Sequence, residues 1–178
     1  MAIIAMVMAM GLPAIERVTY QQVNSTARKM VGLVRTIRND ALLLNSLYRL
    51  GFNLEERTYW VESQGALQLI SEGSSERIVD KKTGKPLPSG FSKVEKYSSE
   101  PISLPNGVTI SSIAKESEGL ITQGIVFIHF FPNGFNEHAI IHLSKEGKDE
   151  VAYSVIIRPT SGRVEIESDK ITTFQILE

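Results

Sequence analysis

The opening stretch of the chain constrains its fold more than any other part. Residues 2–15 read AIIAMVMAMGLPAI and contain no charged or strongly polar side chain. Glu16 and Arg17 follow at once, and a helical pattern then continues to about Asn45. An apolar stem that leads into an amphipathic helix, followed by a strand-rich remainder, predicts an α+β chain with its long helix first.

Three interpretations of this stem are open. A signal peptide would carry a basic region before its apolar run, but only Met1 precedes Ala2. A membrane span needs about 20 apolar residues, whereas 14 helical residues cover only about 21 Å at about 1.5 Å per residue. A run of this length also fits a buried core helix. The stem is most typical of the second half of a membrane helix.

Gly11 and Pro13 interrupt the stem. Proline removes a helix hydrogen bond and clashes with the preceding turn, so we expect a kink or local melting here. The alternative is that Pro13 begins a second helix, where proline is tolerated in the first turn. Both interpretations place helix on each side.

The next segment carries an apolar stripe at steps of three and four residues, which predicts one buried face of a helix. Between Ala14 and Asn45 there is no proline, and Gly32 is the only glycine. We expect the stripe to pack on a sheet; its members are Val23, Ala27, Met30, Val34, Ile37, Ala41 and Leu44.

The period changes from 3.6 to 2 after Asn45, which marks the start of a β-rich part. Residues 48–52 and 59–61 predict a hairpin around a turn at 53–56, and residues 67–70 suggest a further short strand. Residues 71–105 predict a long surface excursion, with short strands at 78–79 and around Val94. Its lysines, Lys81, Lys82 and Lys85, are best interpreted as solvated.

The last third predicts a succession of strands separated by Gly- and Pro-containing turns. The expected strands are residues 108–113, 125–131, 138–143, 151–158, 163–167 and 171–177. Because residues 125–131 are almost continuously apolar, we expect a central strand covered on both faces. About seven to nine strands suffice for an antiparallel β-sandwich or wrapped sheet. The predicted organisation is a helical part, 1–46, and a β-rich domain, 47–178.

The chain offers little for catalysis or metal binding. It has no cysteine, which removes disulfides, thiolate metal sites and a cysteine nucleophile. His138 and His142 would lie about 13 Å apart along a strand, too far for one metal, and His129 fits a hydrogen-bonded sheet residue. No nucleophile motif is present. We therefore expect no enzyme activity, metal or cofactor, and the net charge of −1 gives no reason to expect a nucleic-acid partner.

Several segments together resemble a known family. The stem has Pro13 at a helix-kinking position, residues 27–42 read ARKMVGLVRTIRNDAL, and residues 48–61 read YRLGFNLEERTYWV. Residues 131–134 (FPNG) and 158–164 (RPTSGRV) match late turn elements, although Ser161 stands where the family usually has Thr. On these segments the chain resembles type IV pilin-like proteins, specifically the H-type minor pseudopilins of type II secretion (the GspH/FimT family). Residues 62–124 lie outside the resemblance.

The family begins with a basic leader, a cleavage site and a short start to the helix, none of which is present here. The resemblance implies that Met1 corresponds to a position about nine residues inside the mature helix, giving about 23 apolar positions in all, enough for a span. We therefore expect the coding region to extend upstream. The peptidase site, the methylated N-terminus and the family's helical Glu map to no residue of this chain, and Glu16 is not that Glu because it follows Pro13.

The resemblance implies a structural minor pseudopilin subunit held in the inner membrane by a single helix, with its β-domain in the periplasm. Its partners would be other major and minor pseudopilins, the inner membrane and, as a further candidate, secreted protein cargo. Small residues at the stem suit close helix packing. The implied membrane and filament-core residues are Ala2, Ile3, Ile4, Ala5, Met6, Val7, Met8, Ala9, Met10, Gly11, Leu12 and Pro13.

Two rival functions remain from the sequence. The chain could be a minor type IV pilin that acts in pilus assembly or DNA uptake, although its net charge of −1 disfavours DNA. It could also be a soluble β-domain that binds a small ligand and uses the stem as a core helix. Removing residues 1–15 separates this last idea from the pseudopilin, because a core helix is needed for folding and an assembly stem is not.

Overall fold

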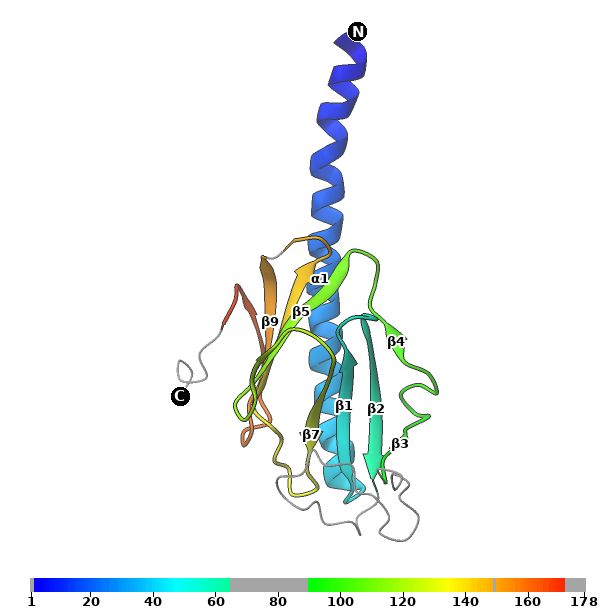
Figure 1. Ribbon diagram of the computed structural model, residues 1–178, viewed down its shortest axis with the longest axis vertical. Coiled ribbons are helices and arrows are strands. Elements are labelled where there is room, and N and C mark those ends of the chain that lie inside the picture. Colours follow the sequence, from blue (N-terminus) through cyan, green and yellow to red (C-terminus); the bar gives the residue numbers. More distant parts are fainter. Residues whose placement is uncertain (1, 65–89, 149, 172–178) are drawn as a thin grey trace.

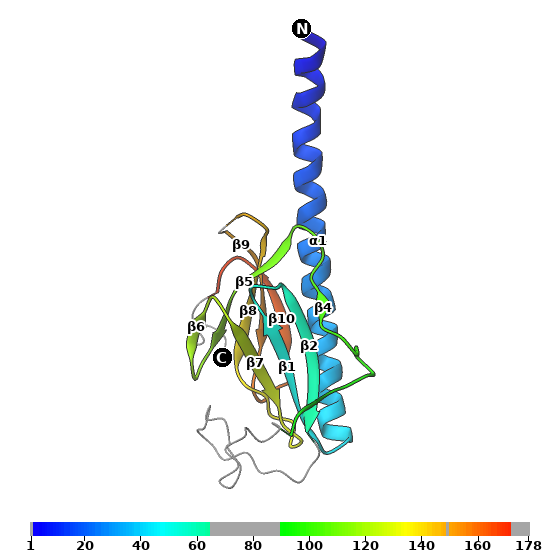
Figure 2. The same ribbon diagram turned by 45° about the vertical axis from the view of Figure 1, so that its right-hand side comes forward.

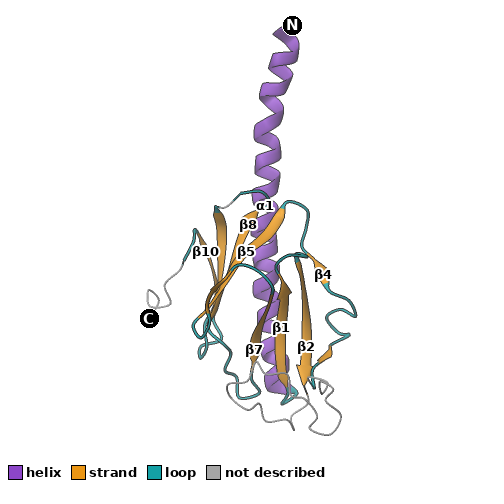
Figure 3. Cartoon of the chain, in the orientation of Figure 1, coloured by secondary structure: helices purple, strands orange, loops and turns teal. Residues whose placement is uncertain are grey.

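One long helix stands beside and beyond a body of two β-sheets (Figure 1). The computed structural model describes residues 2–64, 90–148 and 150–171, with the backbone alone for residues 2–19. Helix α1 is Ala2–Leu43, and ten strands follow it within these described ranges. The secondary structure in Figure 3 separates these parts clearly, with one purple helix and orange strands that form the body. The α+β fold expected from the sequence is confirmed.

Helix α1 continues without a break through Gly11 and Pro13. The expected local melting is therefore not observed, and Pro13 does not start a separate helix. A search of the described residues finds no helix with an apolar stretch long enough to cross a membrane.

The C-terminal end of α1 is closed by a Schellman motif, in which main-chain amides after the helix satisfy its last carbonyls. The Ser46 amide donates to the Ala41 carbonyl at 3.2 Å, and the Asn45 amide donates to the Leu42 carbonyl at 3.4 Å. Asn45 supplies the left-handed conformation that this motif needs, with φ of 46°. The chain then turns directly into the first strand.

The first sheet has the order β3-β2-β1-β7, with β4 also paired to β2. Strands β1 and β2 form the predicted hairpin, in register from Leu47 opposite Gln64 to Asn53 opposite Thr58. Asn53 shapes the turn, because its side-chain oxygen accepts the amides of Glu55 and Glu56. The strands are β1 (Leu47–Asn53), β2 (Thr58–Gln64), β3 (Ser92–Lys93), β4 (Ile102–Ser103) and β7 (Ile125–Phe130).

The second sheet has the order β10-β9-β8-β5-β6 and is antiparallel throughout. Its strands correspond to the runs predicted in the last third, with the short β6 added. The predicted strands at 67–70 and 78–79 lie outside the described residues, as does almost all of 171–177. The strands are β5 (Val108–Lys115), β6 (Gly119–Ile121), β8 (Ala139–Lys145), β9 (Val151–Ile157) and β10 (Val164–Ser168).

The prediction that residues 125–131 form a central strand is wrong. β7 lies at the edge of its sheet, and its burial alternates from the exposed Ile125 to the buried Phe130. The strand that is buried along its whole length is β8. Val126, Ile128 and Phe130 of β7 face the core, whereas Phe127 packs with side chains on the outer face of the sheet.

The core lies between the two sheets and the body half of α1. It contains the buried faces of β1, β7, β8 and β9 together with the apolar stripe of the helix. In Figure 2 the helix runs along one side of the body, so it closes a core that the sheets alone would leave open. Leu44 was expected in the stripe, but it follows the helix end and is 61% exposed.

Candidate functional site

The candidate site is helix α1, because its first part projects beyond the β-body and its second half packs against the sheets (Figure 1). The segment that the sequence predicts as a membrane and filament-core stem, Ala2–Pro13, forms the first turns of α1 and projects beyond the β-body (Figure 1). The helix meets the body near Tyr20, whose ring lies 3.5 Å from the ammonium nitrogen of Lys145. The stem is therefore the end of α1 that extends beyond the sheets.

The second half of α1 is fixed by its apolar stripe. Burial of apolar side chains is the main source of helix stability in such contacts, at about 1.5–3 kcal/mol for a fully buried large residue. The structure places the six stripe residues within the helix in the core, each at most 1% exposed: Val23, Ala27, Met30, Val34, Ile37 and Ala41.

A buried carboxylate anchors the C-terminal end of α1. Both Asp40 oxygens accept from the Lys96 ammonium, at 2.6 and 2.9 Å, and the Tyr97 hydroxyl donates to Oδ2 at 2.8 Å. Burial alone would raise the pKa of Asp40, but the hydrogen bonds from Lys96 and Tyr97 and the Lys96 charge together lower it below its ordinary value. Burial and the bond to Asp40 raise the pKa of Tyr97. A carboxylate near a helix C-terminus is unfavourable by itself, and Lys96 compensates for it.

The two late turns that carry the family resemblance meet at Arg38 of α1. The Arg38 Nε atom donates to the Gly134 carbonyl at 3.1 Å. Gly162 lies against the same side chain, since a Cβ there would fall 2.2 Å from the Arg38 guanidinium. Asn136 joins the turns, because its Nδ2 donates to the Arg158 carbonyl at 2.9 Å. The sequence pattern revealed the turns but not that they converge on the helix.

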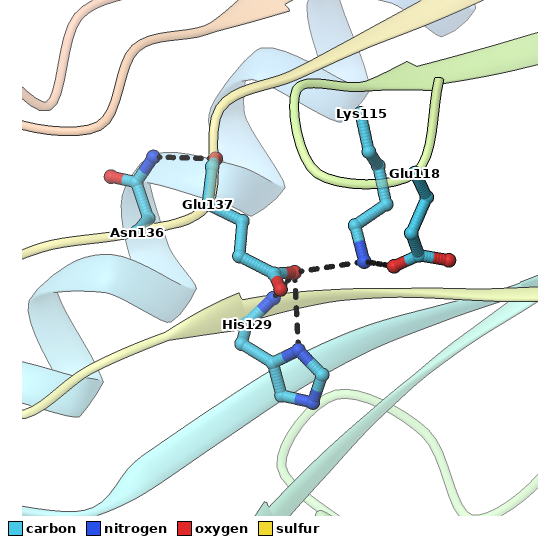
Figure 4. Close-up of polar contacts among 5 residues, drawn as sticks. All are labelled: Lys115, Glu118, His129, Asn136 and Glu137. Atoms are coloured by element: carbon cyan, nitrogen blue, oxygen red, sulfur yellow. Dashed lines mark hydrogen bonds and ion pairs between the residues drawn. The ribbon is translucent and has the colours of Figure 1, made fainter. Parts of the chain in front are cut away.

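A polar cluster joins the two sheets opposite the helix (Figure 4). Lys115, 4% exposed, extends from β5 and lies 3.3 Å from Glu137 Oε2, and it also contacts Glu118. His129 of β7 donates its main-chain amide to Glu137 Oε2 at 2.9 Å and contacts the same oxygen through Nδ1 at 3.1 Å. A buried ammonium requires such partners, because an unpaired charge would be costly.

Glu137 also completes the edge of β7. Its own amide donates to the His129 carbonyl at 3.0 Å, so both outward main-chain groups of His129 are satisfied by one residue. Burial raises the pKa of Glu137, but the bonds and charge of His129 and the charge of Lys115 outweigh it and lower the pKa. Glu137 is therefore a carboxylate that ties the two sheets together.

The second sheet contains a serine–histidine pair that the sequence did not reveal. Ser112 Oγ lies 2.8 Å from His142 Nδ1, and His142 Nε2 lies 2.9 Å from the Ile171 carbonyl. Because that carbonyl can only accept, Nε2 carries the proton and Nδ1 accepts from Ser112. Burial lowers the pKa of His142, which supports the neutral ring. Ser112 is 3% exposed and His142 is 0% exposed, so no substrate can reach the pair.

The remaining histidine arrangement is a surface contact. His138 lies just before β8, not within the expected strand, and its Nδ1 is 3.4 Å from Glu116 Oε2. Burial lowers the pKa of His138, against the raising effect of Glu116. Across the described residues, no group of three or more His, Cys, Asp or Glu side chains could hold a metal ion.

On the outer face of the first sheet, Arg49 lies between two aromatic rings. Its guanidinium carbon is 3.9 Å from the Phe91 ring and 4.0 Å from the Phe127 ring, and Glu62 pairs with it at 2.6 Å. Gly51 leaves room beneath Trp60, since a Cβ would approach that ring within 2.6 Å. This stack covers Phe127 on the outer face of β7.

Comparison with known proteins gives a fold but no close relative. No known family profile matches the sequence, and no curated protein matches it. Two solved structures of the minor pseudopilin EpsH from the type II secretion system of Vibrio cholerae share its fold. One has a TM-score of 0.55 at 10% identity and covers 85% of this chain and 99% of its own. The other has a TM-score of 0.57 at 9% identity and covers 86% of this chain and 98% of its own. The resemblance seen in the sequence is thus confirmed at the level of the fold.

Proposed function

We propose that this chain is a structural minor pseudopilin subunit of a type II secretion filament. The observation that carries the proposal is the apolar first part of α1, which is continuous with a body-anchored second half and projects beyond the sheets. EpsH, which shares this fold, is a minor pseudopilin of such a system. The proposed role is mechanical and needs no catalytic group.

Assembly would transfer the stem from lipid into a bundle of stems. Lipid tails are as apolar as these side chains, so burial alone gives no net gain, and close packing must favour the bundle. Ala2, Ala5, Ala9 and Gly11 recur along the stem and would let neighbouring main chains approach closely. Because the helix is continuous, the packing of the stem would then fix where the β-body lies in the filament.

The proposed location follows from the same arrangement. The stem would lie in the inner membrane before assembly, and the β-body would stand on the periplasmic side. The proposed partners are other pseudopilins of the filament, with secreted protein cargo as a further candidate. Nothing in this role calls for a cofactor.

The test introduces one charge into the stem of the full chain. Val7→Glu should abolish co-fractionation with other pseudopilins and export of a folded secreted protein, because a carboxylate in lipid or in a packed bundle is costly. The melting temperature of the body should not change. Leu120→Glu is the control, since Leu120 is 49% exposed on β6 and accepts the same charge.

Normal export by the Val7→Glu protein would overturn the proposal. Removal of residues 1–15 distinguishes a pseudopilin from a soluble domain that uses the stem as a core helix. A pseudopilin body should stay folded without them, whereas a soluble domain with the stem in its core should lose its cooperative transition. If pilus formation fails while export continues, the subunit belongs to a type IV pilus.

A further inference from the structure

The outward face of the body half of α1 carries three exposed cations. We call Arg28, Lys29 and Arg35 the basic strip; all three are exposed to solvent. The opposite face of the same segment is the buried stripe. The strip therefore lies on the solvent side of the helix, and Arg35 at its edge reaches the main chain of β10 at Val164.

Nothing in the described chain neutralises the strip. Arg28 Nε donates to the neutral Asn24 side chain at 2.9 Å, and Arg35 Nη2 donates to the Val164 carbonyl at 3.4 Å. In the described residues, no carboxylate forms an ion pair with any of the three. Asp40 is the only acid between residues 20 and 43, and it is turned inward to Lys96. A solvated helix face usually mixes both signs, so a strip of one sign indicates an anionic partner.

The charge of the rest of the chain has the opposite sign. Residues 20–43 contain four cations and Asp40, which gives a net charge of +3. Because the whole chain carries −1, all other residues together carry −4. A β-body with this charge balance complements a basic helix face, and such complementarity fixes orientation and accelerates encounter. A neighbour built like this chain would therefore bring a β-body of net negative charge to the strip.

Gly32 leaves space at the centre of the same face. At about 100° per residue, Ser25, Gly32 and Asn39 fall nearly in line, with Arg28 and Arg35 on one side and Lys29 on the other. A Cβ at Gly32 would meet nothing within 4 Å, so its own fold does not require glycine there. Glycine inside a helix costs about 1 kcal/mol relative to alanine. A close approach by a partner would explain why this cost is tolerated.

The face is also hollowed near its start. A shallow, open depression of about 490 Å³ is lined by Gln21, Asn24, Ser25, Arg28 and Lys29. Its two charged side chains belong to the strip, and its other groups can donate hydrogen bonds. The depression has the size and chemistry to accept one or two carboxylate side chains.

We propose that the basic strip is a docking surface for an acidic segment on the β-domain of a neighbouring pilin-like subunit. This inference rests on the proposed function, since bundled stems would bring the neighbour's body alongside α1. The strip runs along the helix axis, so a flat membrane crossed by the stem would touch only its first end. Nucleic acid is disfavoured because the rest of the chain is negative.

Carbodiimide coupling tests the contact directly, because it joins a lysine amine to a carboxylate that already touches it. The full chain is coupled in membranes that contain its filament partners, and adducts are mapped by mass spectrometry. The expected adduct joins Lys29 to an Asp or Glu on another subunit's β-domain. Lys29→Arg is the matched control: it keeps the charge and export but should lose the adduct.

Two further variants test the strip and its central gap. Lys29→Glu should reduce both export and the adducts between this chain and other subunits at least tenfold. Lys93→Glu makes the same charge reversal at an exposed position on β3 and should reduce neither. Gly32→Leu should leave the melting temperature unchanged or raise it, yet reduce export by a similar factor. Gly32→Ala should be more stable than the wild type.

The outcomes separate this inference from the proposed function. If Val7→Glu abolishes assembly while Lys29→Glu and Gly32→Leu export normally, the stem acts as proposed and the strip does not dock a partner. An adduct that survives in Lys29→Arg overturns the inference, as does strip-dependent binding to phosphatidylglycerol vesicles or duplex DNA without any protein adduct. If Val7→Glu has no effect, the proposed function is wrong, and the docking inference that rests on it is wrong as well.

Discussion

The two halves of α1 are one helix with two different sequence patterns. The first is apolar on every side, whereas the second carries apolar residues only at steps of three and four. A helix that is apolar all round requires an apolar environment all round, and a striped helix requires it on one face. The β-body supplies only the second. The difference is what the proposed function would require of one continuous helix, with the β-body as one surrounding and packed stems or lipid as the other.

This division implies that the stem contributes little to the stability of the body. Isolated helices gain little from their own hydrogen bonds, and packing of an apolar face supplies most of their stability in proteins. Equivalent substitutions in the two halves should therefore have unequal effects on unfolding.

The largest expected difference is between Ile37→Ala and Ile4→Ala. Ile37 is 0% exposed, so its truncation leaves a cavity and should lower the free energy of unfolding by about 2–5 kcal/mol. The same change at Ile4 should lower it by less than about 0.5 kcal/mol. Urea denaturation followed by the fluorescence of Trp60 measures both. Equal losses would mean that the stem is part of the cooperative unit.

Asp40→Asn tests the anchor of the body half. Loss of the charged hydrogen bonds should cost about 1–3 kcal/mol at neutral pH. Because the pKa of Asp40 is lowered by folding, its contribution is complete above the unfolded pKa of about 4 and disappears as pH falls through the folded value. Unfolding curves of wild type and variant at pH 7 and near pH 2 should therefore converge at the acidic end. A gap that persists in acid would assign the effect to packing.

Arg38→Ala should have a smaller effect, about 1 kcal/mol, because it removes one hydrogen bond to Gly134 and the contact with Gly162. Arg35→Ala, an exposed position on the same helix, should change the melting temperature very little. The pair separates the arginine that holds the late turns from one in the basic strip. If Arg35→Ala were the more destabilising, Arg38 would not be the attachment point.

Pro13→Ala should have the smallest effect on the body. It restores a main-chain donor within a helix that is already continuous, so amide exchange in the stem should slow. The urea midpoint of the body should stay within experimental error. A clear shift of that midpoint would show that stem and body unfold together.

The sequence predicts the helix and strands of this fold better than it predicts which of them pack together. Periods of 3.6 and 2 predict α1 and the β1–β2 hairpin, since both depend on residues close in the chain. The position of β7 was predicted wrongly because an apolar run does not say what covers it. On the outer face of β7, Arg49 from β1 and the Trp60 ring from β2 pack against Phe127 and provide that cover. Side chains of this kind leave no periodic signal.

The same limit applies to the candidate site. The stripe of α1 can be read from its spacing, and the structure buries its members from Val23 to Ala41. The partners of Asp40 and Arg38 cannot be read this way, because Lys96 and Gly134 are brought near only by the arrangement of the strands. The closed pair of Ser112 and His142 was missed for the same reason. A single sequence carries no direct record of these long-range pairs.

Glu137 has a consequence for subunits that stand side by side. An open strand edge invites a foreign strand to add to the sheet, which leads to irreversible stacking. Here the edge of β7 is occupied at His129 by both the amide and the carboxylate of Glu137. The β-bodies of neighbouring subunits therefore cannot pair strand to strand at His129. In the proposed filament, subunits held by helices and weak surface contacts, not by shared sheets, would be able to dissociate and assemble again.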